Sequence, residues 1–184
     1  MKTSYVFFAD GFEEVEALTS VDVLRRAGMP VTTVSINPEL EVVGAHGVTV
    51  VADSLFDDND YSDAEWLVLP GGMPGATNLA DHEELCRELM AHHGRGGKVA
   101  AICASPSVVL APLGILQGCE AVCYPGMEAP VGGARWGDAP VAVDGHVVTG
   151  NGPAAAPPFA LTLVALSMGD EQAAQVASGM LLKW

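Results

Sequence analysis

Lys98–Pro106 (KVAAICASP) decides the fold class of this chain, because it joins a short apolar strand to a sharp bend and a helix. Lys98–Ile102 has the length and continuous apolar character of a strand buried on both faces of a parallel sheet. We expect a helix from about Ser105 to Leu113, which leaves Cys103 at the bend. Strands that alternate with helices predict an α/β fold with a mostly parallel sheet covered on both faces.

The same alternation extends over the rest of the chain. Glu13–Ala27 predicts a helix, since acids fill its first turn, Arg25 and Arg26 lie in its last turn, and Gly28 follows. The remaining expected elements are strands over Ser4–Ala9, Val31–Ile36, Val48–Ala52, Ala64–Leu69 and Ala121–Tyr124, a helix capped by Asp81 that ends at His93, a hairpin of Val141–Val143 and His146–Thr149 around an Asp144-Gly145 turn, and closing helices over Phe159–Met168 and Glu171–Leu182.

Length and composition narrow the class of protein. The 184 residues suit one domain over positions 1–184. A formal net charge of −15 argues against nucleic acid and anionic lipid as partners, because both would be repelled. No apolar run has the length of a membrane span, and the N-terminus does not resemble a secretory signal. Four sparse cysteines favour reduced thiols and a cytoplasmic location.

Chemistry-bearing residues follow three of the expected strands. Asp10–Glu16 follows the first strand, Pro70-Gly71-Gly72 follows Ala64–Leu69, and Cys103 follows Lys98–Ile102. In an open parallel sheet, ligands bind outside the carboxyl ends of the strands. We therefore expect an acid, a glycine pair and a thiol to meet at one edge of the sheet.

Cys103 has the context of a nucleophile elbow, with small residues Ala104 and Ser105 after it. At a helix N-terminus, free amide N–H groups lower the pKa of a thiol and raise the fraction of reactive thiolate. A buried structural cysteine is the alternative interpretation. Gly71 and Gly72 either present N–H groups as an oxyanion hole or simply form a tight turn, and these two roles are compatible.

Glu13, Glu14 and Glu16 all lie in the first helical turn, where carboxylates stabilise the helix dipole. One acid close to a thiol could be kept protonated by burial and act as a general acid or base. The spacing alone does not distinguish Glu16 from its two neighbours in this role.

The sequence predicts neither a metal nor an organic cofactor. Cys119 and Cys123 lack the second pair that a zinc site needs, and the glycines fit neither a phosphate-binding loop nor a dinucleotide fingerprint. Among the histidines, only His46 is a candidate for the site. His82, His92 and His93 are expected to be solvated ends of helices.

The motifs resemble those of the DJ-1/PfpI superfamily, specifically its DJ-1 (ThiJ-like) branch. The resemblance covers the chain in order, through Gly11–Glu16 with Asp22–Gly28, Leu69–Gly72 with Gly75-Ala76 and Asn78-Leu79, Ala100–Pro106, Thr149 with Gly152-Pro153 and Phe159–Leu161, and Ala174–Val176. It implies a flavodoxin-like three-layer sandwich of the class I glutamine amidotransferase-like superfamily, and a homodimer.

The resemblance also implies roles for residues. Cys103 would be the reactive cysteine in a strained elbow, Glu16 the protonated acid bonded to it, and the amides near Gly72 and Ala104 the oxyanion stabilisers. The implied activity is cofactor-independent conversion of reactive aldehydes or dicarbonyls, as in a glyoxalase III or a deglycase. The implied substrate is a small aldehyde or dicarbonyl, or a glycated amine or thiol. The alternative is a non-enzymatic redox sensor or chaperone whose cysteine is oxidised to sulfinic acid. A cysteine peptidase is a weaker option, because no histidine follows the elbow cysteine.

Three candidate pocket residues depart from the family pattern. Tyr124 replaces the histidine of a Thr-His-Pro motif, so an imidazole proton shuttle is not supported. Asn151 stands in place of an arginine in a Ser-Arg-Gly-Pro-Gly segment, and His46 stands where relatives often carry Arg. The expected pocket is therefore less cationic and holds anions less well.

Overall fold

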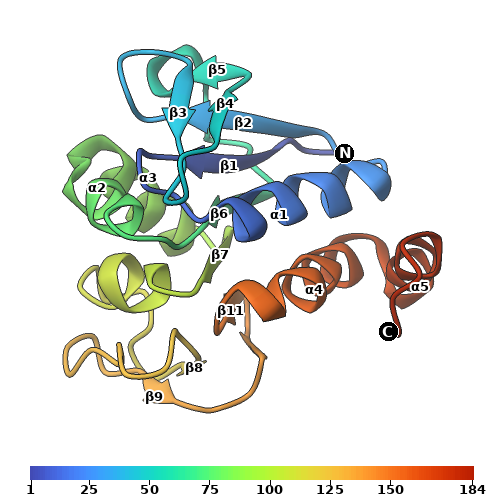
Figure 1. Cartoon of the computed structure of the whole chain (residues 1–184). Coiled ribbons are helices and arrows are strands. Elements are labelled where there is room, and N and C mark those ends of the chain that lie inside the picture. Colours follow the sequence, from blue (N-terminus) through green and yellow to red (C-terminus); the bar gives the residue numbers. More distant parts are fainter.

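A seven-stranded sheet forms the centre of the computed structural model, which describes residues 1–184 (Figure 1). The strand order is β10-β11-β7-β6-β1-β2-β5, and β10 alone runs antiparallel to its neighbour. The strands of this sheet are β1 (Ser4–Phe8), β2 (Val31–Ser35), β5 (Ser54–Leu55), β6 (Trp66–Leu69), β7 (Lys98–Ile102), β10 (Val141–Asp144) and β11 (Val147–Gly150).

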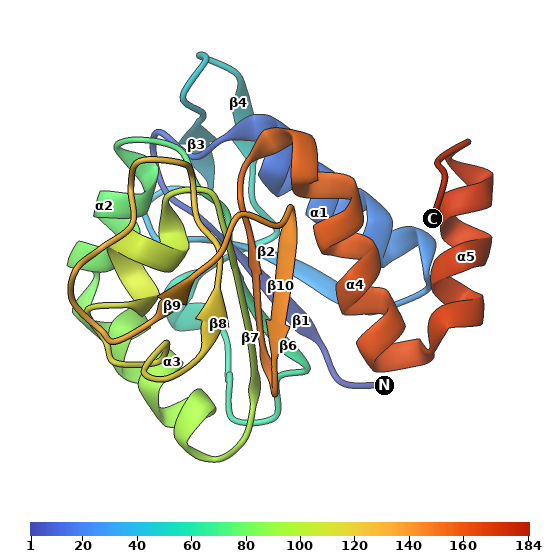
Figure 2. The same ribbon diagram turned by 90° about the horizontal axis from the view of Figure 1, so that it is seen from below.

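Helices cover both faces of the sheet, so the molecule has three layers (Figure 2). Helices α1, α4 and α5 pack against one another on one face, and α2 and α3 lie on the other. The predicted α/β sandwich with a mostly parallel sheet is confirmed. The bounds of the helices are α1 (Glu14–Arg26), α2 (Gly75–Asp81), α3 (Glu83–Gly94), α4 (Ala156–Met168) and α5 (Asp170–Gly179).

Two apolar cores result from the alternation of side chains along the strands. Phe8 and Trp66 belong to the core under α1 and α4, whereas Phe7 and Leu67, their neighbours in sequence, belong to the core under α3. All four side chains are almost completely buried. Both faces of each central strand are thus apolar, which explains the continuous apolar runs in the sequence.

The order β7-β6-β1 at the centre of the sheet positions the site. These three strands are parallel neighbours, so their carboxyl ends lie side by side. The segments that follow them, which contain Cys103, Gly71 and Glu16, therefore meet at one edge, as the sequence predicts.

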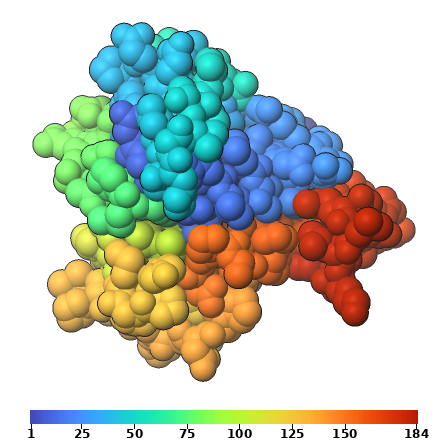
Figure 3. Space-filling model, viewed as in Figure 1, coloured from blue at the N-terminus to red at the C-terminus, as the bar shows by residue number.

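Several local predictions are wrong. Asp81 does not cap α3, because it ends the short helix α2, and the cap is the side chain of His82, which accepts a hydrogen bond from the Leu85 N–H at 3.1 Å. The strand predicted over Val48–Ala52 is present, but it lies outside the main sheet. Its central residues form β4 (Thr49–Val51), which pairs with β3 (Glu41–Val43) in a separate hairpin beside α1 (Figure 3).

Other predictions fail in the second half of the chain. The helix expected after Cys103 is a five-residue π-helix, η2 (Pro106–Leu110), followed by turns. The strand expected over Ala121–Tyr124 is reduced to β8 (Glu120–Ala121), which pairs with β9 (Arg135–Trp136). In the β10–β11 hairpin, Asp144 pairs with Val147, so the two turn residues are Gly145 and His146 rather than Asp144 and Gly145.

Two 3₁₀ turns, η1 (Phe56–Asp58) and η3 (Pro153–Ala155), complete the elements.

The prediction that His92 is solvated is wrong. His92 is buried in α3, and burial lowers its pKa to about 4. None of the helices combines the length and apolarity that a membrane crossing requires.

Candidate functional site

Cys103 occupies a strained bend directly after β7. Its φ of 63° lies in the left-handed region, which costs a residue with a side chain about 1–2 kcal/mol. Backbone hydrogen bonds on both sides hold this conformation. The Cys103 N–H donates to the Gly150 carbonyl at 2.9 Å, and the Cys103 carbonyl accepts from the Tyr124 N–H at 2.8 Å. The strained elbow that the family resemblance implies is therefore present in the structure.

Gly71 leaves room for Cys103 and Glu16 to approach each other. A Cβ atom at position 71 would lie 2.5 Å from the Cβ of Cys103 and 2.8 Å from Oε2 of Glu16. Neither neighbour is the end of a freely moving chain, since both side chains are buried. The close approach of the two groups thus requires a residue without a side chain at this position.

The three acids of the first helical turn have three different partners. Glu13 caps α1, because its Oε2 accepts a hydrogen bond from the Glu16 N–H at 2.7 Å. Glu14 accepts hydrogen bonds from the N–H and from Nδ1 of His46, both at 2.7 Å. Glu16 is completely buried and faces Cys103. The structure thereby identifies Glu16 as the acid beside the thiol, which the spacing of the three acids in the sequence does not.

The Glu16 carboxyl group has one firm hydrogen bond. Its Oε2 accepts from the Gly71 N–H at 2.8 Å, whereas Oε1 is buried without a hydrogen-bond partner. The Cys103 thiol is the remaining group that interacts with this carboxyl. Burial raises the pKa of Glu16 to about 7, and this outweighs the hydrogen bonds from Gly71 and Cys103, which lower it. The carboxyl group therefore keeps its proton to a much higher pH than an exposed glutamate does.

The pKa of Cys103 differs from the sequence-based expectation. Burial raises the pKa of the thiol to about 12, and the negative charge and hydrogen bond of Glu16 raise it further. The amides of Gly72 and Ala104 lower it, but they do not compensate, partly because η2 is too short to supply a full helix dipole. The thiol is thus held neutral while Glu16 is ionised.

Cys103 and Glu16 behave as one coupled pair. The first proton leaves the pair near neutral pH, and the negative charge that remains opposes loss of the second. A thiolate at neutral pH consequently requires that the remaining proton reside on Glu16. The amides of Gly72 and Ala104 act on the sulfur and favour this arrangement.

The two glycines of the predicted oxyanion hole have different roles. The Gly71 N–H is already bonded to Glu16, so it is not available to an oxyanion at the sulfur. Gly72 has a φ of 91°, and a Cβ there would lie 2.4 Å from the Gly11 carbonyl oxygen. Its amide, together with that of Ala104, interacts with the Cys103 sulfur. Gly72 and Ala104 are therefore the amides that lower the pKa of the Cys103 thiol and the remaining candidates for an oxyanion hole.

The three candidate pocket residues are placed differently from one another. Tyr124 is 48% exposed, its N–H is bonded to Cys103, and its ring lies against Gly152. Asn151 follows Gly150, the residue whose carbonyl accepts the Cys103 N–H. The structure thus brings Tyr124 and Asn151 next to the elbow, whereas the exposed ring of His46 is bonded to Glu14 rather than to the Cys103–Glu16 pair.

Sequence reasoning missed the role of Ser105. Its buried hydroxyl donates to the Pro70 carbonyl at 2.5 Å, which ties the elbow to the loop that carries Gly71. The only signal in the sequence is a small residue after the cysteine, which equally suits packing. The hydroxyl role depends on the neighbouring strand and was therefore not readable from the sequence.

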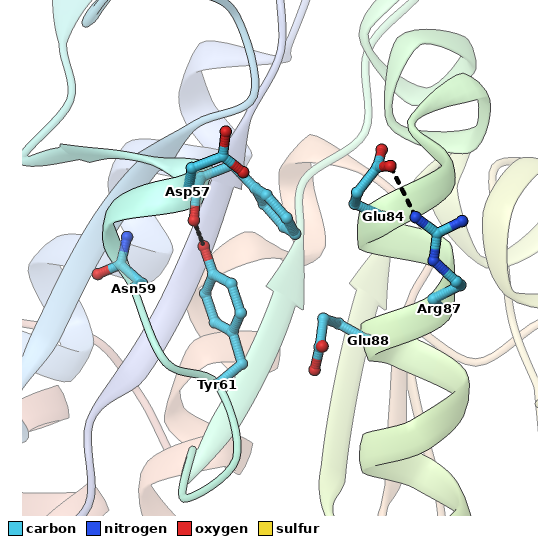
Figure 4. Close-up of a pocket in the computed structure, with 7 residues that line it drawn as sticks. Asp57, Asn59, Tyr61, Glu84, Arg87 and Glu88 are labelled. Carbon is cyan, nitrogen blue, oxygen red and sulfur yellow. Dashed lines mark hydrogen bonds and ion pairs between the residues drawn. The ribbon is translucent and has the colours of Figure 1, made fainter.

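Other concave or ligand-rich features lie away from Cys103. The cavity shown in Figure 4, with a volume of about 320 Å³, lies between the loop that carries Tyr61 and the helix that carries Glu84, and Cys103 is not among its lining residues. Glu13, Glu14 and His46 have donor atoms within 4.8 Å of one another. These atoms already serve the cap of α1 and the Glu14–His46 pair.

Comparison with known proteins gives consistent matches. The sequence profile of the DJ-1/PfpI family matches residues 2–166. The Parkinson disease protein 7 homolog of Danio rerio is 37% identical over 186 residues, which cover 99% of this chain and 98% of that protein. A protein named deglycase from Pyrococcus abyssi is 32% identical over 152 residues, which cover 80% of this chain and 89% of that protein.

The solved structure of oxidized Toxoplasma gondii DJ-1 is 36% identical and superimposes with a TM-score of 0.92, with 100% of both chains covered. The chain also matches the DJ-1 homologs B and A of Arabidopsis thaliana at 35% identity, over 95% and 99% of its own length, but it spans only 40% and 47% of those proteins.

Gly71→Ala tests the close approach at the site. The added methyl group would collide with Cys103 and Glu16, so we expect the free energy of unfolding to fall by about 1–3 kcal/mol. Urea unfolding measures the change. Gly94→Ala at the end of α3 is the matched control, since nothing lies within 4 Å of its added Cβ, and we expect it to be neutral or slightly stabilising. Equal effects of the two substitutions would contradict the packing argument.

Glu16→Gln tests the raised pKa. The folded-state pKa of about 7 exceeds the ordinary value of 4.5, so the folded protein holds this proton more tightly than the unfolded chain does. Between pH 4.5 and 7, the free energy of unfolding of the wild type should therefore fall relative to that of Glu16→Gln, by on the order of 3 kcal/mol. Urea unfolding at several pH values measures this difference. Glu39→Gln, an exposed control, should parallel the wild type, and a parallel profile for Glu16→Gln would refute the assignment.

Proposed function

Because the chain belongs to the DJ-1/PfpI family, we propose that it is a cysteine-dependent, cofactor-independent enzyme that acts on reactive aldehydes and dicarbonyls. The observation that carries this proposal is the pairing of the buried Glu16 carboxyl group with Cys103 at a strained elbow. The relative named deglycase supports the same class of substrate. In this proposal Cys103 is the nucleophile and Glu16 is the group that moves protons.

The first step is nucleophilic attack. With the shared proton on Glu16, the Cys103 sulfur bonds to the aldehyde carbon of methylglyoxal, and the electron pair of the C=O bond moves to oxygen. The N–H groups of Gly72 and Ala104 stabilise this oxyanion, since they already act on the sulfur. Glu16 donates its proton to the oxygen, which gives a neutral hemithioacetal and an ionised carboxylate.

The later steps move hydrogen within the substrate and release it. The Glu16 carboxylate removes the proton from the former aldehyde carbon, which gives an enediolate, and returns this proton to the adjacent carbonyl carbon. The hydroxyl proton on the first carbon passes to the oxygen on the second, so that the first carbon becomes the carbonyl of a thioester. This internal redox step oxidises the first carbon and reduces the second, so no external oxidant is needed. The resulting lactoyl thioester is hydrolysed by water, which yields lactate and restores the Cys103 thiol.

A second candidate function is redox sensing, and Tyr124 is the observation that favours it. A phenol stands beside the elbow where relatives carry an imidazole, so proton transfer depends on Glu16 alone. When turnover is slow, peroxide competes with substrate for the Cys103 sulfur and converts it to sulfinic acid, with Glu16 as the hydrogen-bond partner of the new group. The oxidized Toxoplasma gondii relative is consistent with such chemistry in the family.

We also propose that the protein is a homodimer. Val15 and Leu18 on α1 and Val43, Val48 and Val51 on the β3–β4 hairpin are exposed apolar side chains, each between 40% and 66% exposed. The hairpin lies beside α1 on one face of the molecule (Figure 3). An exposed apolar surface is typical of an interface between protein chains, and the family resemblance implies a two-fold homodimer.

The remaining proposals concern location and organisation. The four cysteines are free in the structure, which supports a reducing compartment such as the cytoplasm. Helix α4, near the end of the sequence, packs on α1, near its start, and α5 packs on α4, which supports one domain over residues 1–184.

Cys103→Ala tests the enzymatic proposal. We expect the purified wild type to convert methylglyoxal to lactate and the variant to lose this activity by at least about 10³-fold, because the attacking atom is gone. A lactate assay on metal-free protein measures the rate. Cys123→Ala, which removes a nearby buried cysteine outside the proposed machinery, is the control and should retain activity.

Treatment with mild peroxide separates the two candidate functions. Equal rates for wild type and Cys103→Ala would end the enzymatic proposal. Selective addition of two oxygen atoms at Cys103, seen by mass spectrometry without measurable dicarbonyl turnover, would establish the sensor instead.

Val51→Lys together with Leu18→Lys tests the dimer. Placing two charges in the apolar surface should shift the equilibrium to monomers by at least about tenfold in Kd, because each ammonium would have to be desolvated. Light scattering after size exclusion measures the mass. Leu166→Lys, an exposed apolar residue on α4 outside this surface, should leave the mass unchanged, and a monomeric wild type would overturn the proposal.

A further inference from the structure

Two histidines outside the proposed site lie close together near the amino end of strand β7, opposite to the end that carries Cys103. His93 lies in the last turn of α3, and His146 is the second residue of the β10–β11 turn. The His146 carbonyl accepts a hydrogen bond from the N–H of Val99, near the start of β7, whereas Cys103 follows the end of that strand. The two imidazoles therefore belong to a separate region, and the proposed chemistry does not use them.

The ring nitrogens of these histidines are close enough to share one ion. Nδ1 of His93 lies 3.1 Å from Nε2 of His146, the ring centroids are 4.7 Å apart, and the ring planes are inclined by 38°. Imidazole nitrogens bind Zn²⁺ at about 2.0–2.1 Å, so two such ligands on one ion stand roughly 3 Å apart. We propose that His93 and His146 form a chelating site for a divalent transition-metal ion of the copper and zinc type.

The hydrogen bond between the two rings shows that the facing nitrogens are aimed at each other. A neutral imidazole nitrogen has a lone pair that it can donate to a metal ion. In the absence of an ion, the close nitrogens share one N–H···N hydrogen bond. Ion binding requires that the ring which donates this bond move its proton to its outer nitrogen.

The backbone around both ligands is already ordered. The His93 carbonyl accepts from the Gly96 N–H at 2.9 Å, and the His146 carbonyl accepts from the Val99 N–H at 2.9 Å. Both side chains are partly exposed, so an ion can enter and water can complete its coordination. The ligands do not need to fold around the metal, which lowers the entropic cost of binding.

The chemistry of the donors indicates which ions bind most tightly. Two imidazole nitrogens with open positions for water suit Cu²⁺ and Zn²⁺, whereas Mg²⁺ and Ca²⁺ prefer oxygen ligands. Among divalent first-row ions, Cu²⁺ binds most tightly to a nitrogen site of this kind. The formal net charge of −15 adds a long-range attraction for any cation.

Titration with Cu²⁺ tests the site. The experiment uses full-length protein with Cys103→Ala, so that the thiol of the elbow neither binds nor reduces the ion. We expect one equivalent of Cu²⁺ to bind, with an electron paramagnetic resonance spectrum that carries hyperfine splitting from two imidazole nitrogens. His93→Gln and His146→Gln should each raise the Kd at least about tenfold, since each leaves a single ligand. His46→Gln should bind as the parent protein does.

Three results would overturn the proposal. They are an unchanged Kd in both glutamine variants, a spectrum without coupling to nitrogen, and loss of binding in His46→Gln, which would move the ion to the Glu13–Glu14–His46 group. Circular dichroism verifies that the variants fold. A measurement without substitutions at the site is also decisive, because substoichiometric Cu²⁺ should broaden the imidazole NMR signals of His93 and His146 before those of the other histidines.

Discussion

The contact between the Glu16 carboxyl group and the Cys103 sulfur is the constraint on which the rest of the site depends. The carboxyl group is completely buried, and only one of its oxygens has a firm hydrogen bond. A fully ionised carboxylate in this position is costly, because burial removes its solvation. The proton that the pair retains is therefore a consequence of packing. Helix α1, the Gly71-Gly72 loop and the elbow at Cys103 together enclose the carboxyl group.

The order of the strands in the sheet brings Glu16 and Cys103 together. Strands β1, β6 and β7 are parallel neighbours, so α1, the Gly71-Gly72 loop and the elbow leave the sheet at the same edge. Hydrogen bonds from the neighbouring segments hold the left-handed backbone of Cys103 in place. The strain energy of this conformation, about 1–2 kcal/mol, is small compared with the free energy that burial of the two apolar cores contributes to folding. A rigid scaffold thus keeps a locally unfavourable conformation.

The acids of α1 show where sequence reasoning reaches its limit. Their position in the first turn follows from the helix dipole and was readable from the sequence. Their division into a cap, a partner of His46 and a partner of Cys103 depends on what surrounds each face of the helix. The pKa of Cys103 is a similar case. Local sequence suggests a lowered value, but burial and the charge of Glu16 raise it.

The sequence by itself determined the α/β class, most of the strands and helices, and the meeting of an acid, a glycine pair and a cysteine. Apolar periodicity, helix-end charges and turn residues act over a few positions, so a linear reading detects them. Tertiary structure decided that His82 rather than Asp81 caps α3, that β4 lies outside the main sheet, and that Glu16 is the completely buried acid that faces Cys103. It also placed His93 beside His146, 53 positions away in sequence. Such contacts depend on the register and burial of distant segments, which no local pattern encodes.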